Sequence, residues 1–175
     1  TRFRNVTGVQ TCALPILPLM KIAVISDTHF GVRNDSPLFL EYSLKFFESI
    51  FFPYLEANNI NTVIHMGDLL DRRKYVNFNT LAQVKKRFFQ PLLDRGIKMH
   101  CIPGNHDTYW KNTNDLNSLR ELFHDEIHLY EKPTTVDFDG CSILFVPWIT
   151  KENSEECEIA LENSVSPVLV GHLEL

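Results

Sequence analysis

Short apolar runs alternate with amphipathic stretches along the first part of the chain. Residues 21–26, 61–66 and 97–102 are almost continuously apolar, which is typical of strands buried on both faces of a parallel sheet. Between them, residues 36–55 and 79–95 carry apolar side chains at helical spacing. The alternation predicts a β-α-β-α-β order with right-handed crossovers between parallel strands.

The pattern changes in the second part of the chain. Two apolar runs there flank Asp139-Gly140, the strongest short signal for a β-hairpin. A hairpin after a parallel unit predicts two packed sheets with helices outside. The expected elements are helices at 115–123 and 153–163 and strands at 127–130, 134–138, 141–146 and 168–170.

Prolines mark the expected helices. Ser36 and Pro37 open the first helix, with serine as the N-cap and proline in the first turn. Pro53 and Pro91 fall near the ends of the two helices. Proline has no N–H to donate, so each should kink or restart the last turn.

Each of four apolar runs is followed directly by polar side chains. In open α/β sheets, ligands bind at the carboxyl edge of the strands, so we expect these side chains to meet at one edge. They are Asp27 and His29 after the first run, Asp68 after the second, Asn105, His106 and Asp107 after the third, and His172 after the last.

The residue types indicate a site for two metal ions. Mixed Asp, Asn and His donors suit manganese, iron or zinc better than calcium, which prefers oxygen alone. Asp68 is the natural bridge, because a carboxylate has two oxygens. Two cations roughly 3.5–4 Å apart form the clamp used for in-line attack on phosphate esters. His106, which adjoins Asn105, can donate a proton to the leaving alkoxide as a general acid.

Other candidate side chains have less specific interpretations. His65 and His100 lie inside expected strands, where a hydrogen-bonded interior histidine is a simpler interpretation than a metal ligand. Arg72 can contact phosphate, and it can equally form a salt bridge to Asp68 or Asp71. The sequence leaves both interpretations open.

The composition is that of a globular protein with an acidic balance. Hydrophobic residues make up 44% of the 175 residues, and the formal net charge is −5 at pH 7. This charge argues against DNA binding through a broad basic face, but not against nucleic acid at a site where divalent cations reverse the local field. The basic run at 72–74 fits a solvated loop better than a contact to the DNA backbone. The four cysteines lack CxxC spacing, which favours free thiols in a reducing compartment.

Residues 1–19 differ from the rest of the chain. Their apolar stretch, 14–19, is too short to span a bilayer, and no small-residue cleavage site of a secretory signal follows it. Residues 6–16 resemble the translation of a common sequencing adapter. We therefore expect residues 1–19 to be a disordered, non-native leader, Met20 to be the true start, and the fold to comprise residues 20–175 without a membrane segment.

Taken together, the motifs at the strand ends resemble the calcineurin-like metallophosphoesterase family. They are Asp27-x-His29, Gly67-Asp68-x-x-Asp71-Arg72, Gly104-Asn105-His106-Asp107 and Gly171-His172. Within that family, the chain is most similar to the nuclease subunits of SbcCD-type and meiotic-recombination-eleven-type repair complexes, and especially to those of T-even-like phages. This narrower resemblance lies in residues 132–141, 147–148 and 170–175.

The resemblance implies a four-layer α/β/β/α metallophosphoesterase sandwich and two divalent metal ions, with manganese as the expected metal. It further implies exo- and endonuclease activity on DNA, an ABC-type ATPase partner with a coiled coil, a homodimer, and a cytoplasmic location in the bacterial host of a phage. In that pattern Asp27, His29, Asp68, Asn105 and His172 are metal ligands, while His106 and Asp107 are catalytic, His106 as the acid.

Two features of the family fall outside the sequence. Family members supply two further ligands from a Gly-His-x-His motif well after the position of His172, and they carry a capping domain that helps to hold DNA. The chain ends at Leu175 before either feature. We therefore expect a sandwich and a metal site that are incomplete at the C-terminus, and a fragment that is inactive by itself.

Two alternatives stay open. A phosphodiesterase or phosphatase for small substrates would share the superfamily motifs, although the similarity at 132–141 and 170–175 favours the nuclease. A non-catalytic scaffold would keep the fold but lose ligand residues, whereas every ligand expected before the end of the chain is present.

Overall fold

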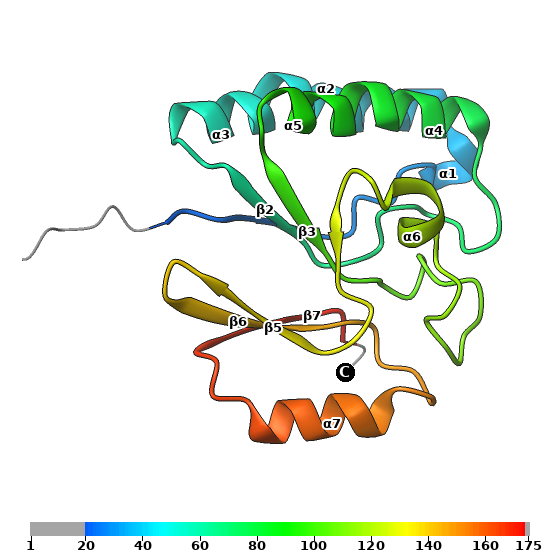
Figure 1. Cartoon of the computed structure of the whole chain (residues 1–175). Coiled ribbons are helices and arrows are strands. Elements are labelled where there is room, and N and C mark those ends of the chain that lie inside the picture. The colour runs from blue at the N-terminus through cyan, green and yellow to red at the C-terminus, as the bar shows by residue number, and fades with distance from the viewer. Residues whose placement is uncertain (1–19, 174–175) are drawn as a thin grey trace, which may run out of the picture.

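The computed structural model describes residues 20–173, so the expected leader at 1–19 lies outside the described residues. The chain forms four layers, in which two β-sheets face each other between a pair of long helices and helix α7 (Figure 1). The predicted α/β/β/α arrangement is therefore confirmed.

The first sheet contains four parallel strands in the order β1-β2-β3-β4. They are β1 (Ala23–Ile25), β2 (Thr62–His65), β3 (Lys98–Cys101) and β4 (His128–Leu129). Each lies inside a predicted strand and is shorter than it, because the apolar runs continue into the connecting loops. Every residue of β2 is buried, as expected for a central strand that is covered on both faces.

Two long helices cover the outer face of this sheet, and each contains a π-helical turn just before a proline. The first comprises α2 (Pro37–Phe46), η1 (Phe47–Phe51) and α3 (Phe52–Ala57), and the second comprises α4 (Phe78–Val84), η2 (Lys85–Phe89) and α5 (Gln90–Asp94). The rings of Pro53 and Pro91 crowd the carbonyl four residues earlier, which lies in the π turn in both helices. The wider turn relieves this conflict, so each helix continues where we expected a kink or a restart.

A core rich in phenylalanine lies between the helices and the first sheet. Phe47 and Phe88 come from the two long helices, and their ring centroids lie 4.7 Å apart in an edge-on arrangement. Phe89 stacks on Phe123 at 4.6 Å. Such pairs add to the stabilisation that burial provides. Phe123 ends α6 (Ser118–Phe123), which begins later than predicted because Asn117 is its N-cap.

The second sheet contains the predicted hairpin. β5 (Thr134–Phe138) and β6 (Cys141–Val146) pair antiparallel within the predicted bounds. Asp139 and Gly140 have φ values of 52° and 89°, which suit a tight two-residue turn. β7 (Val168–Gly171) pairs parallel with β6, and α7 (Ser154–Asn163) packs its buried Cys157 on the outer face. The core between the two sheets includes Ile64, Ile102, Phe145 and Val170.

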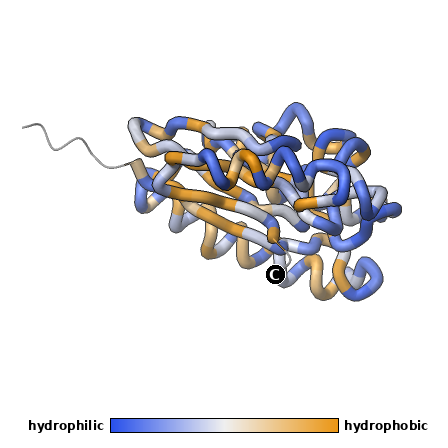
Figure 2. Tube along the Cα trace, turned by 90° about the horizontal axis from the view of Figure 1, so that it is seen from below, coloured by the Kyte–Doolittle hydropathy of each residue, from blue (hydrophilic) through white to orange (hydrophobic). Residues whose placement is uncertain are grey.

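The loops that follow the parallel strands gather at one end of the molecule. Figure 2 shows hydrophilic segments concentrated at that end and apolar segments along the strands. One of these loops contains α1 (Val32–Asp35), in which Arg33 and Asn34 have left-handed φ values of 56° and 61°, so α1 is a tight turn and not a regular helix. Among residues 20–173, no helix is both long and apolar enough to cross a membrane.

Candidate metal centre

Four loops converge at the carboxyl edge of the first sheet, and backbone contacts hold them together. The N–H groups of Asp27 and His29 donate to carbonyls of the loop after β2, at 3.1 and 3.0 Å. A Cβ atom on Gly67 would lie 2.7 Å from the backbone of Gly104, so glycine lets the loops after β2 and β3 approach this closely. The close approach brings side chains from distant parts of the sequence to one point.

Three residues of this edge have backbone angles that are rare outside glycine. The φ value is 54° at Asp27, 42° at His29 and 58° at Asp68. Each such angle costs on the order of 1–3 kcal/mol and persists only where the surrounding structure holds it. Three of the residues that we expected to bind metal therefore have strained backbone angles, as do five other non-glycine residues among those described.

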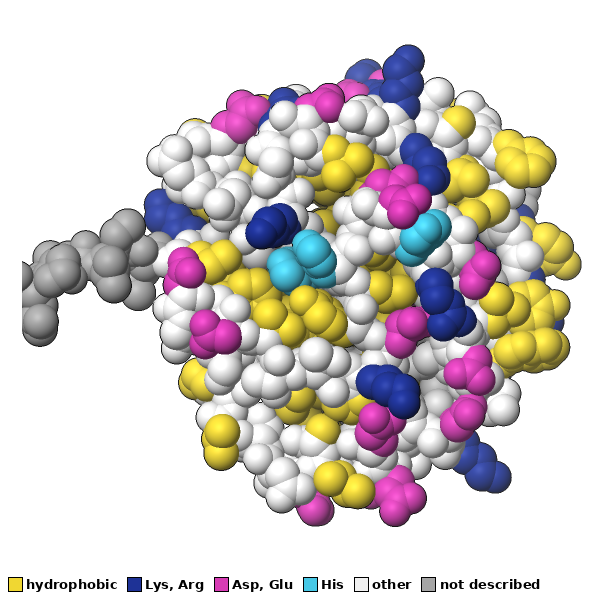
Figure 3. Space-filling view, in the orientation of Figure 1, with side chains coloured by type: hydrophobic (Ala, Val, Ile, Leu, Met, Phe, Trp, Pro, Cys, Tyr) yellow, Lys and Arg dark blue, Asp and Glu magenta, His cyan; other side chains and the backbone are white. Residues whose placement is uncertain are grey.

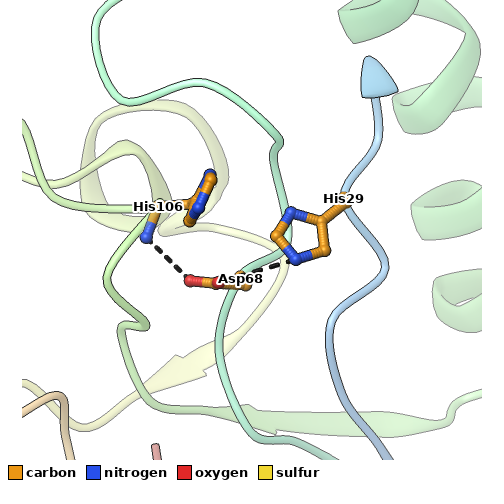
Figure 4. A group of neighbouring side chains, drawn as sticks. All are labelled: His29, Asp68 and His106. Atoms are coloured by element: carbon orange, nitrogen blue, oxygen red, sulfur yellow. Dashed lines mark hydrogen bonds and ion pairs between the residues drawn. The ribbon is translucent and has the colours of Figure 1, made fainter. Parts of the chain in front are cut away.

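Asp68 lies at the centre of the cluster and is only 3% exposed. Its Oδ1 accepts a hydrogen bond from the His106 N–H at 2.7 Å, and its Oδ2 lies 3.6 Å from the Nε2 atoms of both His29 and His172. Figure 4 shows His29 and His106 on either side of this carboxylate. A single carboxylate therefore faces two imidazoles with one oxygen and a backbone amide with the other.

The side chains form two groups of candidate ligands that share Asp68. One contains His29, Asp68 and His106, and the other contains Asp27, Asp68 and His172; the ligand atoms of each group lie within 4.8 Å of one another. Asn105 joins the second group, because its Oδ1 lies 2.9 Å from the Nε2 of His172. The five predicted ligands are thus brought together. Asp27 and His29 also lie close together, with 3.6 Å between Oδ1 and Nε2, and the first group places His106 close enough to bind as well.

The imidazole of His172 fits a cation better than it fits its present neighbours. Its Nδ1–H donates to the Met66 carbonyl at 2.8 Å, so its Nε2 carries a lone pair. That lone pair points toward the oxygens of Asn105 and Asp68, which are also electron-rich. The Nδ1 of His29 is buried and has no hydrogen-bond partner among residues 20–173. The mixed nitrogen and oxygen donors suit a divalent transition metal.

His106 is held in one orientation by the loop after β2. Its Nδ1–H donates to the Asp71 carbonyl at 2.5 Å, and its ring meets the His29 ring edge-on with centroids 4.8 Å apart. This hydrogen bond fixes the tautomer and leaves Nε2 as the atom that can exchange a proton or bind a metal.

Asp107 lies behind the site and does not face it. Its carboxylate is fully buried and accepts four backbone N–H groups: from Asp68 at 2.7 Å, Gly104 at 2.9 Å, Leu69 at 3.0 Å and Leu70 at 3.4 Å. Burial raises the pKa of Asp107 to about 6, although these hydrogen bonds oppose the rise. We expected Asp107 to be catalytic, and this geometry does not support that role, because no oxygen remains free to meet a substrate.

His65 is an interior histidine, as expected, and it also connects two of the loops. The Gly67 N–H donates to its Nδ1 at 3.2 Å, and its Nε2–H donates to the Thr28 hydroxyl at 3.0 Å. Thr28 in turn donates to the Leu69 carbonyl at 3.1 Å. Burial lowers the pKa of His65 to about 3, so the ring stays neutral. Apart from the position of Thr28 between two expected ligands, no residue pattern predicted this chain of hydrogen bonds.

Arg72 has different partners from those that the sequence suggested. Its guanidinium lies 3.6 Å from the Asp35 carboxylate and bonds to the Asn34 side chain. The salt bridge to Asp68 or Asp71, one of the two interpretations that the sequence left open, is not formed. Arg72 instead ties the tight turn of α1 to the loop after β2.

Comparison with known proteins points to one family. Residues 20–159 match the family described as calcineurin-like phosphoesterase. The chain is 37% identical over 158 residues to "Exonuclease subunit 1" of Enterobacteria phage T4, which covers 89% of this chain and 46% of that protein. It is 31% identical over 133 residues to "DNA double-strand break repair protein Mre11" of Saccharolobus solfataricus, which covers 75% of this chain and 34% of that protein.

Among solved structures, the chain is similar to a nuclease named MPE of Pseudomonas putida, with a TM-score of 0.47 and 21% identity, over 71% of this chain and 52% of that one. The chain thus spans less than half the length of the two curated relatives that it matches.

Proposed function

The chain belongs to the calcineurin-like phosphoesterase family, and from this premise we propose that it hydrolyses phosphodiester bonds of DNA with two divalent cations. One observation carries the proposal: the buried carboxylate of Asp68 is shared by both groups of candidate ligands. A carboxylate with two oxygens can bridge two cations, and a pair of bridged cations is the arrangement used for in-line displacement at phosphorus.

The residues that would hold the cations are Asp27, His29, Asp68, Asn105 and His172. Their mixed oxygen and nitrogen donors suit manganese, iron or zinc, and manganese is the metal that the family resemblance implies. Bound cations would supply a Lewis acid and a water of lowered pKa. Without them, the carboxylates of Asp27 and Asp68 would repel a phosphate. The strained backbone at Asp27, His29 and Asp68 keeps these donors in place before any ligand arrives.

His106 is the proposed general acid. Its Nδ1–H is engaged by the Asp71 carbonyl, so a proton on Nε2 is the one available to the leaving alkoxide oxygen. Asp107 would act through other residues: its carboxylate holds the Asp68 and Gly104 amides, which sets the distance between the loops that carry Asp68 and His106.

DNA is the proposed substrate because the two curated relatives are named as an exonuclease subunit and a double-strand break repair protein. A small-substrate phosphodiesterase and a non-catalytic scaffold are the alternatives. The test uses protein from the full reading frame, with manganese binding measured by calorimetry and hydrolysis measured on duplex DNA and on bis-p-nitrophenyl phosphate. Manganese-dependent DNA cleavage is the expected result. Turnover of the small ester alone would favour the first alternative, and absence of metal binding would favour the scaffold.

We also propose that the 175-residue chain by itself binds manganese weakly and cleaves DNA little. Each candidate group offers three His or Asp donors among the described residues, and two adjacent cations repel one another unless enough protein charge offsets them. Robust manganese-dependent cleavage of duplex DNA by this chain alone would show that the ligand set is wrong.

The proposal has three further parts, which are a homodimer, an ABC-type ATPase partner with a coiled coil, and a cytoplasmic location in a bacterial host.

An exposed apolar stripe along α2, η1 and α3 supports the dimer. Its side chains are 45–67% exposed and recur every four residues, at Leu38, Tyr42, Phe46, Ile50 and Tyr54. Acidic and basic side chains, including Glu41 and Lys45, flank it, so a second copy related by a two-fold axis can pair with it. Sedimentation of Tyr42→Glu should give a monomer, and an unchanged mass would remove this surface from the interface.

A further inference from the structure

A cavity of about 190 Å³ lies between the loop after β2 and the loop after β3. A second, open hollow runs beside it and is lined by residues 71–75 and His106, so residues 72–75 border both. Figure 3 shows basic, acidic and apolar side chains interspersed on the right of this face of the molecule. The hollow beside the cavity is therefore lined by the proposed general acid, His106.

The walls of the cavity are mostly apolar, and its rim is aromatic and basic. Leu70, Val76 and Leu122 line the interior. Tyr75 lines the cavity and is 73% exposed, and Trp110, which follows the lining residue Tyr109 without itself lining the cavity, is 51% exposed. Large aromatic side chains left this exposed beside a catalytic site need a reason, because solvent exposure of an aromatic ring is unfavourable.

Cationic side chains accompany these rings. The Lys74 Nζ lies 4.9 Å from the Tyr109 ring centroid and 5.8 Å from that of Trp110. Lys74 forms no salt bridge among residues 20–173. Arg72, Arg73 and Lys74 line the cavity together with one carboxylate, that of Glu121, and Arg72 is itself paired with Asp35. In a chain of net charge −5, this is a local basic surface with exposed rings, the combination that binds single-stranded nucleic acid.

Two polar atoms at the wall lack partners. The Arg73 Nη1 and the Ser118 Oγ are buried without a hydrogen bond among the described residues, and both side chains line the cavity. The Arg73 guanidinium also lies over the Trp148 ring, 5.0 Å from its centroid. A flat group with ring nitrogens and carbonyl oxygens would supply the missing acceptors.

We propose that this cavity takes one unpaired base of a DNA strand whose phosphate lies at the metal centre, with Tyr75 and Trp110 stacking on bases at the rim and Lys74 facing the backbone. The inference rests on the proposed function. A volume of about 190 Å³ is below the roughly 300–1,000 Å³ of pockets that enclose a whole ligand, so a single ring system fits better than a nucleotide. A base inside a duplex cannot reach the cavity without leaving its stack, so the preferred substrate is a single-stranded or frayed end.

The test uses protein from the full reading frame and a short strand that carries 2-aminopurine, whose fluorescence reports stacking. Tyr75→Ala and Trp110→Ala should each raise the Kd for the single strand by roughly 5- to 150-fold, the effect of losing one stacked base. Tyr75→Phe, which keeps the ring, should bind nearly as the parent does. Ile159→Ala, an exposed apolar residue on α7, is the matched control and should change neither affinity nor fluorescence.

The same variants are then compared on the single strand and on bis-p-nitrophenyl phosphate. The loss on the strand should exceed the loss on the small ester, since the ester reaches only the metal centre. Unchanged strand affinity in both alanine variants, or equal losses on the two substrates, would overturn the base site. If the parent protein hydrolyses neither substrate, the proposed function fails, and the binding measurements still decide the base site on their own.

Discussion

Two buried carboxylates, Asp68 and Asp107, lie on adjacent loops of the site and differ in what satisfies them. Asp107 is fully buried and accepts four backbone N–H groups. Asp68 is 3% exposed, accepts one N–H, and presents its other oxygen to two histidine nitrogens at 3.6 Å. At the rear of the site, the hydrogen bonds of Asp107 are all made within the chain. At the front, one oxygen of Asp68 accepts no hydrogen bond from the described part of the chain.

Histidines show the same contrast. Both ring nitrogens of His65 are hydrogen-bonded within the chain, while His29 makes no side-chain hydrogen bond among the described residues: its Nε2 lies 3.6 Å from Asp27 and Asp68, and its Nδ1 lies 3.6 Å from Asp71. A buried polar group without partners is costly, so a fold keeps one only where something else repays that cost. We infer that Asp107 and His65, whose hydrogen bonds are made within the chain, position the loops. Asp68 and His29, whose hydrogen bonds are not all made among the described residues, are available to a ligand.

Removing the Asp107 carboxylate should produce the largest effect. Asp107→Ala leaves four buried N–H groups without an acceptor, and each costs roughly 1–3 kcal/mol, so we expect a loss of at least about 4 kcal/mol in the free energy of unfolding. Urea unfolding of the purified chain measures it. Asp68→Asn, which keeps an acceptor oxygen for the His106 N–H, is the matched control and should cost less than about 1 kcal/mol. Similar losses in the two variants would remove the distinction between rear and front.

His106→Gln should separate proton transfer from metal binding at the front. We expect turnover of DNA to fall by roughly 10²–10⁴-fold, the usual contribution of a general acid, while manganese affinity stays nearly intact. Calorimetric manganese titration beside nuclease assays of the full-length protein gives both values. His106 also lies in one of the candidate ligand groups, so a collapse of metal affinity together with activity would reassign it as a ligand.

Asp68→Asn should lower activity more than Asp27→Asn does. Asp68 belongs to both candidate groups and Asp27 to one, so the first change affects two cations and the second affects one. Several kcal/mol of charge stabilisation correspond to roughly 10²–10³-fold for Asp68, with a smaller loss for Asp27. Nuclease rates at saturating manganese test the order. Equal losses, or a milder effect at Asp68, would argue against a bridging carboxylate.

The fold was largely predictable from the sequence, because its strands are apolar runs with clear ends. The Asp139-Gly140 hairpin has the predicted bounds, since only residues that tolerate positive φ fit that turn. The π turns before Pro53 and Pro91 were not predicted, because a proline in a helix can be accommodated in several ways that packing decides.

The site was predictable in membership but not in orientation. The sequence placed Asn105, His106 and Asp107 at one strand end, but in a tight turn neighbouring side chains point to different sides. The Asp107 N–H donates to the Gly104 carbonyl at 3.2 Å, and this turn directs its carboxylate to the rear. The partner of Arg72 was missed for a related reason. The left-handed turn of α1 brings Asp35 close to Arg72, and no residue pattern predicted that turn.

The smallest predicted effect concerns His100, a histidine of β3 that belongs to neither group of candidate ligands. Its Nδ1 pairs with the Tyr130 hydroxyl at 2.7 Å and its ring stacks on His128 at 4.8 Å; burial, with smaller contributions from His128 and Lys98, lowers its pKa from 6.5 to about 4. As the pH falls below 6.5, His100 becomes protonated in the unfolded chain, whereas in the folded chain it stays neutral until about pH 4. The stability due to neutral His100 is therefore full above pH 6.5 and lost toward pH 4, by roughly 2 kcal/mol at pH 5.

Other groups, including His65 and Asp107, also titrate in or near this range, so the informative quantity is the difference between the parent and His100→Gln, which keeps a polar group beside Tyr130. Urea unfolding at pH 7.5 and pH 5 should show that the free energy of unfolding falls by about 2 kcal/mol more in the parent than in the variant. Equal falls would mean that His100 is protonated in the folded protein at pH 5 and that burial does not lower its pKa.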